Sequence, residues 1–406
     1  MARQVDNSRI IVKKFGGTSV MTQGDRSRIR DLVLLDLQKE LIPVLVVSAM
    51  GRQSAPYATD TLIGLYRQIH QATNHRDLDL LMSCGEIISA TLISATLNAA
   101  GLVSRALTGF HAGIVTDNTH GGAEVLAVNP EYIEKLLSEG IIPVISGFQG
   151  ISVEGEITTL GRGGSDTTAA LIGEALKAQK VEIYTDVEGV MTADPTIVEN
   201  ATILSGMTYE EMYEMARHGA KVLDFNAVDV AKRSGLKLVI KNSSSSFAGT
   251  TVTDRVLDER VLTAITSDEP WTQYQLENLK ESFDDKGFMD ELSRRKISID
   301  MINFFEASKY FIIDSRLEDS LDEALEALGI AYDKRKDCAK VTVIGHRIHG
   351  VPGIMRRIVN ALEGNGITIL QTSDSSMTIS CLIRNDRASD AVNYLHQAFD
   401  MEKNEG

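Results

Sequence analysis

The segment KFGGTSV, residues 14–20, places a lysine, two glycines and two hydroxyl side chains directly after an apolar run. Backbone N–H groups at Gly16 and Gly17 can approach an anion closely because neither residue has a side chain. Lys14 would add a point charge, and hydroxyl groups at the start of a helix would add donors. The segment is a candidate phosphate-binding turn, although an ordinary strand-to-helix turn has the same composition. It is not a P-loop, because GxxxxGK[ST] is absent.

A second glycine-rich segment, GRGGSDTTAA at residues 161–170, stands directly before an apolar-periodic stretch. Ser165 and Asp166 are good N-cap residues, so a helix is predicted from this point. A helix N-terminus next to Arg162 can bind a carboxylate or a phosphate, because a guanidinium group forms two parallel hydrogen bonds with either. The alternative is a flexible loop with a solvated arginine. The three glycines, the arginine and the capped helix together favour the ligand site.

Acidic residues complete the set of candidate groups. In YTDVEGVMTADP, residues 184–195, a strand runs into a turn that contains Asp186 and Asp194. These carboxylates could pair with a ribose, a metal-bound nucleotide or a lysine, or they could simply form the turn. Glu86 lies within the apolar helical pattern LMSCGEIISA, where a carboxylate needs a partner. A substrate ammonium group could be that partner, unless this face of the helix is exposed.

Buried-strand patterns position these segments. RIIVKKF, IPVLVVSAM, IIPVISGF, VEIYTDV and LKLVIKN are nearly continuous apolar runs, which is the pattern of strands buried on both faces of a parallel sheet. Helical patterns alternate with them. This alternation predicts an α/β sandwich with a mostly parallel sheet over residues 1–250. Loops at the C-terminal ends of such strands are where ligands bind in this class of fold.

The rest of the chain contains an internal repeat. Residues 288–313 align without gaps with residues 358–383, which pairs Phe288 with Ile358 and Leu292 with Leu362. Each copy reads as a helix and two strands, and flanking segments extend the later copy to βαββαβ. The repeat predicts two tandem modules of this kind, at residues 258–330 and 335–406.

Composition narrows the class of protein. A length of 406 residues suggests two or three domains, and 43% hydrophobic with 24% charged residues is typical of a globular protein. The net charge of −15 argues against general nucleic-acid binding. No long apolar run or signal segment is apparent, so we expect a cytoplasmic protein without a membrane partner. Three cysteines without CxxC indicate no zinc site, and we expect no metal held by protein side chains alone.

The motifs KFGGTSV, VSAMG, SCGE, GFQG, GRGGSDTTAA, TDVEGVMTADP and GAKV, in this order, resemble the aspartokinase family of the amino acid kinase superfamily. The repeat, with GVPGIMRRIVNAL, resembles the paired ACT modules that bind amino-acid effectors in that family. The resemblance implies transfer of the γ-phosphoryl group of ATP, with Mg²⁺, to the β-carboxylate of L-aspartate. It also implies feedback regulation through the ACT modules and a homo-oligomer joined through them, and it leaves the effector open between lysine, threonine, diaminopimelate and none.

The resemblance also assigns roles to single residues. Lys14 would offset phosphate charge during transfer, and Asp166 would orient the lysines, so these two are the expected catalytic residues. Glu86 would take the substrate ammonium and Arg162 a substrate carboxylate. The nucleotide would be bordered by Lys14, Phe15, Gly16, Gly17, Ser48, Thr185, Asp186, Val190, Asp194 and Lys221. The other expected substrate-binding residues are Thr59, Phe148, Gln149, Gly163, Gly164 and Ser165.

The sequence departs from the family's pattern in three places. Thr196 stands where an arginine usually follows TADP, and Asp224 with Phe225 replaces the usual proline-containing continuation of GAKV. The starting segment of the first ACT module, VLTAITSDEPWTQYQL, carries Trp271 and two acids in an unusual context, which bears on the identity of the effector. Two alternatives therefore stay open. One is a kinase of the same fold for another small carboxylic acid, such as N-acetylglutamate, and the other is a weakly active or non-catalytic relative that senses amino acids.

Overall fold

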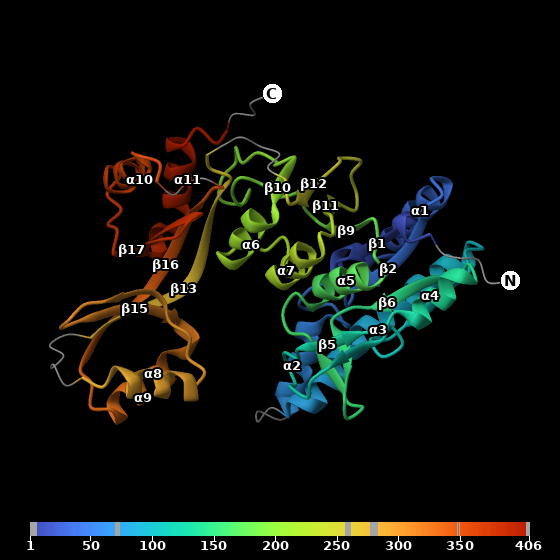
Figure 1. The fold of residues 1–406 in the computed structure, drawn as a ribbon, viewed down its shortest axis with the longest axis horizontal. Helices are drawn as coiled ribbons and strands as arrows, with labels where there is room; N and C mark the ends of the chain where they lie inside the picture. The colour runs from blue at the N-terminus through green and yellow to red at the C-terminus, as the bar shows by residue number, and fades with distance from the viewer. Residues whose placement is uncertain are drawn as a thin grey trace. The chain divides into compact units, whose positions relative to one another are not determined.

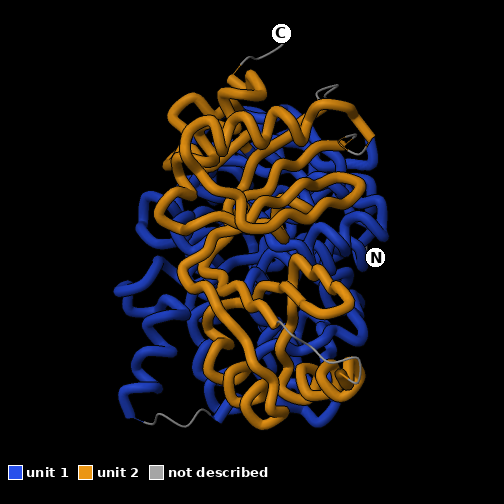
Figure 2. The backbone as a smooth tube through the Cα atoms, turned by 90° about the vertical axis from the view of Figure 1, so that its left-hand side faces the viewer, with its two compact units in different colours: residues 1–190, 203–213, 221–258 blue, residues 191–202, 214–220, 259–406 orange. Residues whose placement is uncertain are grey.

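A computed structural model of the chain describes residues 6–69, 74–255, 261–276, 283–346, 348 and 350–402. The chain divides into two compact units, drawn in two colours in Figure 2. The first comprises residues 1–190, 203–213 and 221–258, and the second comprises residues 191–202, 214–220 and 259–406. The predicted domain boundary at residue 250 would place residues 191–202 and 214–220 in the first domain. This boundary stays a prediction. Residues 258 and 406, which bound the predicted modules, lie outside the described residues.

An eight-stranded sheet forms the centre of the first unit, in the order β10-β12-β11-β9-β1-β2-β6-β3 (Figure 1). Among the described residues every neighbouring pair is parallel except β11 with β12. The prediction of a mostly parallel α/β sheet is therefore confirmed. The strands are β1 (Ile10–Phe15), β2 (Ile42–Val47), β3 (Ser104–Leu107), β6 (Ile142–Ser146), β9 (Lys180–Thr185), β10 (Gly206–Thr208), β11 (Leu238–Asn242) and β12 (Thr250–Thr253).

Helices cover this sheet, and a smaller sheet of order β5-β4-β7-β8 adjoins it. The smaller sheet consists of β4 (Ile114–Thr116), β5 (Val125–Val128), β7 (Gln149–Ser152) and β8 (Ile157–Thr159). The helices are α1 (Gln23–Gln38), α2 (Thr59–Ile69), α3 (His75–Ala99), α4 (Glu131–Ser138), α5 (Gly164–Ala175), α6 (Tyr209–Arg217) and α7 (Phe225–Ser234), with 3-10 turns η1 (Asn7–Arg9) and η2 (Gly17–Val20). The first residues of α6 belong to the first unit and its last turn to the second.

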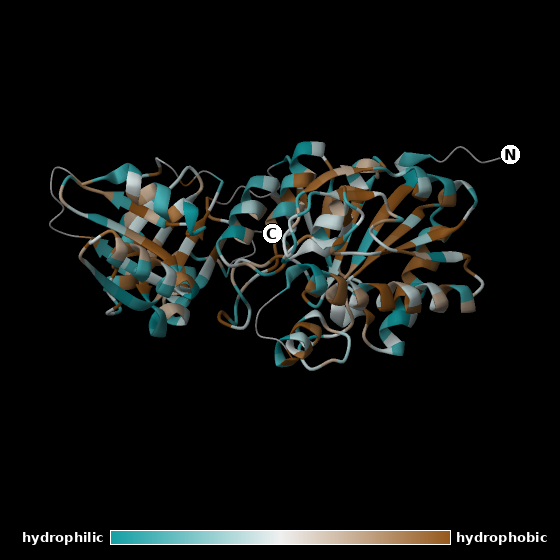
Figure 3. Cartoon of the chain, turned by 90° about the horizontal axis from the view of Figure 1, so that it is seen from below, coloured by the Kyte–Doolittle hydropathy of each residue, from teal (hydrophilic) through white to brown (hydrophobic). Residues whose placement is uncertain are grey.

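Strand alternation divides β1 between the two faces of the sheet. Phe15 belongs to a core cluster with Val33 of α1 and Ile93 of α3, so these helices cover its face. Lys14 points to the opposite face, where its ion pair with Asp166 joins β1 to α5. Figure 3 shows how strongly apolar residues concentrate along the strands. The alternation of side chains along β1 therefore places Lys14 on the face of the sheet where α5 begins.

The helix α3 is long and apolar enough to cross a membrane by length and composition, and half of its most apolar window is buried inside the first unit. Its buried residues include the polar side chains of Asp79, Ser83 and Glu86. These polar groups lie at positions 79, 83 and 86, which is the spacing of one helical face. The pattern is that of a core helix that presents a polar stripe to its own unit.

The second unit contains a six-stranded sheet of order β14-β15-β13-β16-β18-β17. Its strands are β13 (Ala264–Leu276), β14 (Asp300–Phe304), β15 (Lys309–Asp314), β16 (Tyr332–Ile344), β17 (Gln371–Asp374) and β18 (Thr378–Arg384). Its helices are α8 (Asp285–Arg294), α9 (Glu318–Ala327), α10 (Ile354–Glu363) and α11 (Ala388–Ala398), with 3-10 turns η3 (Ser315–Leu317) and η4 (Asn385–Arg387). Each repeat forms a helix and two strands, so the predicted pair of ACT-like modules is confirmed.

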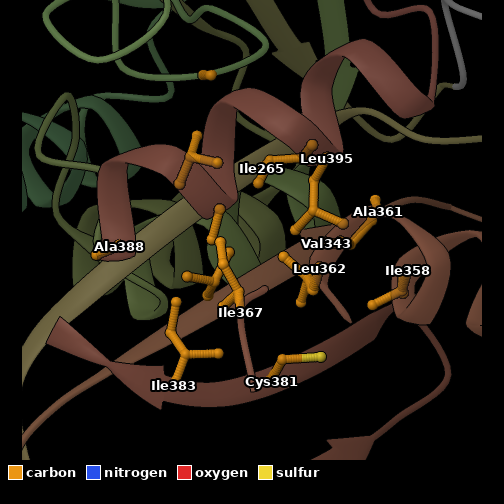
Figure 4. Packing of buried hydrophobic residues seen from close by; sticks show 14 of the residues in the cluster. Ile265, Val343, Ile358, Ala361, Leu362, Ile367, Cys381, Ile383, Ala388 and Leu395 are labelled. Carbon is orange, nitrogen blue, oxygen red and sulfur yellow. The ribbon is translucent and has the colours of Figure 1, made fainter. Parts of the chain in front are cut away.

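The two modules share their long strands. The end of β13, up to Leu276, pairs with the start of β16 at Tyr332, whereas Ala264 at the start of β13 pairs with Ile344 at the end of β16. The second module therefore obtains its outer strand from β13 and not from residues after α11. Figure 4 shows its core, where Ile358 and Leu362 of α10 pack with Ile383 of β18. In the first module Phe288, Leu292 and Ile313 occupy the corresponding core positions.

Candidate active site

The predicted phosphate-binding turn lies where β1, β2 and β9 end side by side. Gly16 N donates a hydrogen bond of 3.2 Å to Tyr184 O of β9, and Gly51 N donates one of 2.9 Å to Gly17 O. A Cβ atom on Gly17 would lie 2.5 Å from Gly51 O and 2.6 Å from Ala49 O, so only glycine fits there. The close approach of three chain segments therefore explains the second glycine of the motif.

The two predicted catalytic residues meet across the face of the sheet. Lys14 Nζ lies 2.7 Å from Asp166 Oδ1, and both side chains are only about a tenth exposed. Asp166 stands in the first turn of α5, where the helix dipole favours a negative charge. Gly163 precedes this helix with φ 71°, a left-handed conformation that glycine adopts at little cost. The structure thus brings Lys14 and Asp166 together, and their catalytic roles stay a prediction.

Glu86 is a buried carboxylate with one unpaired oxygen. Its residue is 2% exposed, so the alternative of a solvent-exposed face is wrong. Oε1 accepts a hydrogen bond of 3.1 Å from Ala49 N, whereas Oε2 has no hydrogen-bond partner among the described residues. Burial raises the pKa of Glu86 to about 8. A cationic ligand would satisfy the free oxygen and restore the charged form of this carboxylate.

The turn between β6 and β7 connects α3 with α5. Gln149 is buried, and its Nε2 donates a hydrogen bond of 3.1 Å to Ser83 O on α3. Phe148 adopts φ 70°, and its backbone N–H donates a hydrogen bond of 3.1 Å to Thr168 Oγ1 on α5. A non-glycine residue with positive φ is held by its surroundings, and such residues are enriched at functional sites. The two predicted residues therefore lie between the helices that carry Glu86 and Asp166.

Arg162 and Ser165 flank the start of α5. Arg162 is exposed and makes no hydrogen bond or ion pair with any described residue, so its guanidinium is available to a ligand. Ser165 is buried within the first turn, next to Gly164. The unusual Asp224 lies against this loop, because a Cβ on Gly163 would be 2.4 Å from Asp224 Oδ2. Burial raises the pKa of Asp224, and the charge of Asp166 acts in the same direction.

The predicted nucleotide residues divide into three groups. Ser48 N donates a hydrogen bond of 3.0 Å to Phe15 O beside the glycine turn. At the end of β9, Thr185 Oγ1 donates a hydrogen bond of 3.1 Å to Asp186 Oδ1. Val190 is fully buried, with its N–H bonded to Thr250 Oγ1 at 2.8 Å. Of the other predicted nucleotide residues, Lys221 belongs to the first unit and Asp194 to the second. Thr59, which the resemblance assigns to the substrate, begins α2 in the first unit.

Asp194 and Thr196 form a local turn in the second unit. Asp194 Oδ1 accepts hydrogen bonds of 2.8 Å from Thr196 N and 2.7 Å from Thr196 Oγ1. The neighbouring Ala193 and Val198 are buried in the core of the ACT modules. This packing explains why the segment belongs to the second unit. The assignment of Asp194 to the nucleotide stays a prediction.

Arg52 is a functional candidate that the motifs did not reveal. It follows Gly51 directly and forms an ion pair with Asp186, which lies 134 positions further along the chain. The signal in the sequence is a single arginine after VSAMG, and its partner is too distant to be inferred locally. The structure therefore adds one cationic side chain to the edge of the sheet where the glycine turn lies.

A buried charged cluster lies on the opposite face of β1. Lys13 Nζ is 2.6 Å from Asp36 Oδ2 on α1 and 3.3 Å from Glu182 Oε2 on β9. Tyr184 OH donates a hydrogen bond of 2.8 Å to Glu182 Oε2. Although burial opposes it, the charges of Lys13 and Lys180 hold the pKa of Glu182 at about 2. These contacts fix β1 between β9 and α1 and so position Lys14.

Comparisons with known proteins identify the family. The amino acid kinase family model matches residues 9–242, and an ACT domain model matches residues 334–397. The chain is 36% identical over 403 residues to aspartokinase 1 of Bacillus subtilis, which covers 97% of this chain and 100% of the relative. The aspartokinase of Geobacillus stearothermophilus is 37% identical over 401 residues, with 96% and 97% covered. This chain belongs to the aspartokinase family.

Solved aspartokinase structures agree with this assignment. Escherichia coli aspartokinase III in complex with aspartate and ADP superimposes with a TM-score of 0.79 at 26% identity, covering 96% of this chain and 99% of the other. The same enzyme in complex with lysine and aspartate gives a TM-score of 0.73 at 27% identity, covering 97% and 100%. The resemblance noted in the sequence and the predicted fold class are therefore confirmed. In this aspartokinase family member the candidate site lies within the region that the amino acid kinase model matches.

Proposed function

We propose that the chain is an aspartate kinase, a phosphotransferase that moves the γ-phosphoryl group of ATP to the β-carboxylate of L-aspartate. The products are ADP and 4-phospho-L-aspartate, at the first step of lysine, threonine, methionine and diaminopimelate biosynthesis. The observation that carries the proposal is the unpaired Oε2 of buried Glu86. The other oxygen, Oε1, accepts a hydrogen bond from Ala49 N, which lies beside the Gly16–Gly17 turn. A cation-binding carboxylate next to an anion-binding turn suits an amino-acid substrate that meets a polyphosphate.

The substrate contacts follow from these positions. Glu86 takes the ammonium group, because its free oxygen lacks a partner among the described residues. Arg162 and the start of α5 take a carboxylate, since the guanidinium is exposed and the helix begins at Gly164. Phe148 and Gln149 hold the wall of the pocket between α3 and α5. N-acetylglutamate has no ammonium group and would leave Glu86 unsatisfied, which favours aspartate over that alternative.

The transfer step requires positioning and charge stabilisation. An oxygen of the β-carboxylate forms a bond to the γ-phosphorus, while the bond from that phosphorus to the leaving oxygen of ADP breaks. The carboxylate is already ionised at neutral pH, so no general base is needed. Lys14, held by Asp166, offsets the charge of the phosphoryl oxygens, and the N–H groups of the glycine turn add donors. Mg²⁺ would be held mainly by the phosphates of ATP, and the half-exposed Asp186 offers a suitable oxygen.

Regulation and assembly belong to the second unit in this proposal. Lysine is bound in one solved structure of Escherichia coli aspartokinase III, and we propose that lysine, threonine or diaminopimelate binds the ACT modules of this chain. Ile302, Phe304 and Phe305 expose apolar surface around β14 and favour contact with a second copy. The proposed form is therefore a cytoplasmic homo-oligomer joined through its ACT modules. An effector there would act by shifting the kinase between states of different activity.

The test is ADP release from Mg-ATP with and without L-aspartate. Glutamate and N-acetylglutamate serve as competing acceptors, and Lys14→Ala serves as the catalytic control. Turnover that needs aspartate and falls about 10³-fold in the variant would support the proposal. Turnover with N-acetylglutamate alone would assign another acceptor. A folded protein that binds lysine or threonine but turns over no acid would be an amino-acid sensor.

A further inference from the structure

The ion pair between Arg52 and Asp186 crosses the end of β1. The strands lie in the order β9-β1-β2, so the loop after β1 is flanked by the loops after its two neighbours. Arg52 follows Gly51, whose N–H is bonded to Gly17 O, and Asp186 lies two positions after Tyr184, whose carbonyl accepts from Gly16 N. The ion pair therefore connects the two outer loops beside the glycine turn that carries the anion-binding N–H groups.

This ion pair is easily exchanged for another. The side chain of Arg52 is 71% exposed and that of Asp186 is 50% exposed, so water competes for both charges. Exposed ion pairs of this kind contribute little to stability. By contrast, Lys14 is paired with the largely buried Asp166, and Lys13 lies on the opposite face of the sheet with Asp36. Arg52 is thus the guanidinium beside the turn that a polyphosphate can capture.

Resting on the proposed function, we propose that Arg52 is a further catalytic residue of the phosphoryl transfer. When ATP occupies the glycine turn, the guanidinium exchanges the carboxylate of Asp186 for oxygens of the γ-phosphoryl group. A planar guanidinium binds such oxygens with two parallel hydrogen bonds. Arg52 donates hydrogen bonds throughout and neither gains nor loses a proton. The new oxygen–phosphorus bond forms to the substrate carboxylate, and the electron pair of the broken bond leaves with ADP.

The geometry also explains why the arginine is paired in the free protein. Asp186 holds the guanidinium beside the turn by a solvent-exposed ion pair. The release of Asp186 on nucleotide binding then provides a carboxylate at the same edge of the sheet. One exchange of partners therefore delivers a cation to the transferring group and an anion to the nucleotide or its Mg²⁺.

The experiment compares Arg52→Ala, Arg52→Lys and the control Arg30→Ala with the wild type. Arg30 is a suitable control because its ion pair with Asp31 lies within α1. Each protein is checked for folding by circular dichroism, and kcat and KM are measured with aspartate. Affinities for ADP and for a non-hydrolysable ATP analogue are measured by titration. Guanidinium chloride at millimolar concentration is added to Arg52→Ala to replace the missing group.

The inference predicts that kcat falls about 10²-fold in Arg52→Ala and by a smaller factor in Arg52→Lys, with Arg30→Ala unchanged. It also predicts that KM for aspartate and the ADP affinity change less than threefold, that the ATP analogue binds at least tenfold more weakly, and that guanidinium restores part of kcat. A kcat within threefold of wild type, an equal loss of affinity for ADP and the analogue, or a loss that guanidinium does not restore would overturn it.

The same measurements separate this inference from the proposed function. Wild-type turnover with aspartate decides the function, independently of any arginine variant. If the wild type turns over and Arg52→Ala does so equally well, only the role of Arg52 fails. If the wild type does not turn over any acid, the proposed function fails. The ratio of the two nucleotide affinities in Arg52→Ala then still decides whether the guanidinium binds the γ-phosphate.

Discussion

Replacing Glu86 with glutamine changes the stability and the substrate binding of this kinase in opposite directions. The carboxylate is buried, one oxygen is unpaired among the described residues, and burial raises its pKa from 4.5 to about 8. Between these two values the folded protein holds a proton that the unfolded chain has released. A rise in pH through this window therefore destabilises the wild type, because the native carboxylate is forced to ionise without a partner.

The size of this effect follows from the shift in pKa. A difference of about 3.5 pKa units between the unfolded and folded states corresponds to about 5 kcal/mol once the pH exceeds 8. Glutamine has the same shape and does not ionise. We therefore expect the stability of Glu86→Gln relative to wild type to increase by up to about 5 kcal/mol between pH 4.5 and pH 9. For a unit of this size that corresponds to about 10 °C in Tm.

The assay is thermal unfolding of both proteins over this range of pH. Glu182→Gln is the matched control, because the pKa of Glu182 is held at about 2 despite its burial. Its ionised form stabilises the protein above pH 4.5, and that contribution is lost as the pH falls toward 2. The two variants should therefore differ in sign near neutral pH, with Glu86→Gln more stable than wild type and Glu182→Gln less stable.

Aspartate binding provides a second test of the ionisation state of Glu86. At pH 7 most of Glu86 is protonated in the free protein, so binding an ammonium group releases most of one proton. Calorimetric titrations in two buffers of different ionisation enthalpy measure this number. Glu86→Gln should bind aspartate at least 10²-fold more weakly and release no proton. A wild type that binds aspartate without proton release, and a stability difference that does not change with pH, would refute the assigned ionisation of Glu86.

Other variants test the surroundings of the site. Gly17→Ala should weaken nucleotide binding and lower the unfolding free energy by about 2 kcal/mol, since its Cβ would lie 2.5 Å from Gly51 O; titration with ADP and urea unfolding measure both. Lys13→Met should destabilise the first unit by about 3–5 kcal/mol in urea, because Asp36 and Glu182 would lose their buried cation. Asp224→Asn should lower KM for aspartate several-fold where Asp224 is ionised and have little effect where it is protonated, because its charge lies beside the loop that carries Arg162. The raised pKa of Asp224 should make this benefit disappear at a higher pH than for an ordinary aspartate; a KM ratio independent of pH would contradict this.

Local sequence predicted the parts of the site that lie at strand ends. Each buried apolar run became a strand of the parallel sheet, and Lys14 met Asp166 because the start of α5 follows the glycine motif directly. The apolar helix around Glu86 left burial and exposure of this carboxylate both open, and the structure shows it buried. These features depend on residues within one strand, turn or helix.

Long-range packing decided what the sequence did not reveal. Asp194 belongs to the second unit because its neighbours Ala193 and Val198 enter the core of the ACT modules. The second module obtains a strand from β13, since residues far apart in the chain pair along β16. The ion pair of Arg52 with Asp186 joins two loops separated by 134 positions. No periodicity or motif encodes such a contact, so it becomes visible only when the loops are placed.

Adjacent lysines on β1 show how stability and catalysis are connected in this fold. A shift of one residue along the strand would exchange the faces of Lys13 and Lys14. The contacts of Lys13 with Asp36 and Glu182 oppose that shift, because each of these buried carboxylates would lose its partner. The structural Lys13 therefore keeps Lys14, the proposed catalytic lysine, on the face of α5. Glu86 acts in the contrary direction, since its unpaired carboxylate destabilises the free protein above pH 4.5. The buried cluster offsets this penalty, which in the proposed function the bound substrate removes, as expected where a binding site is built at the expense of stability.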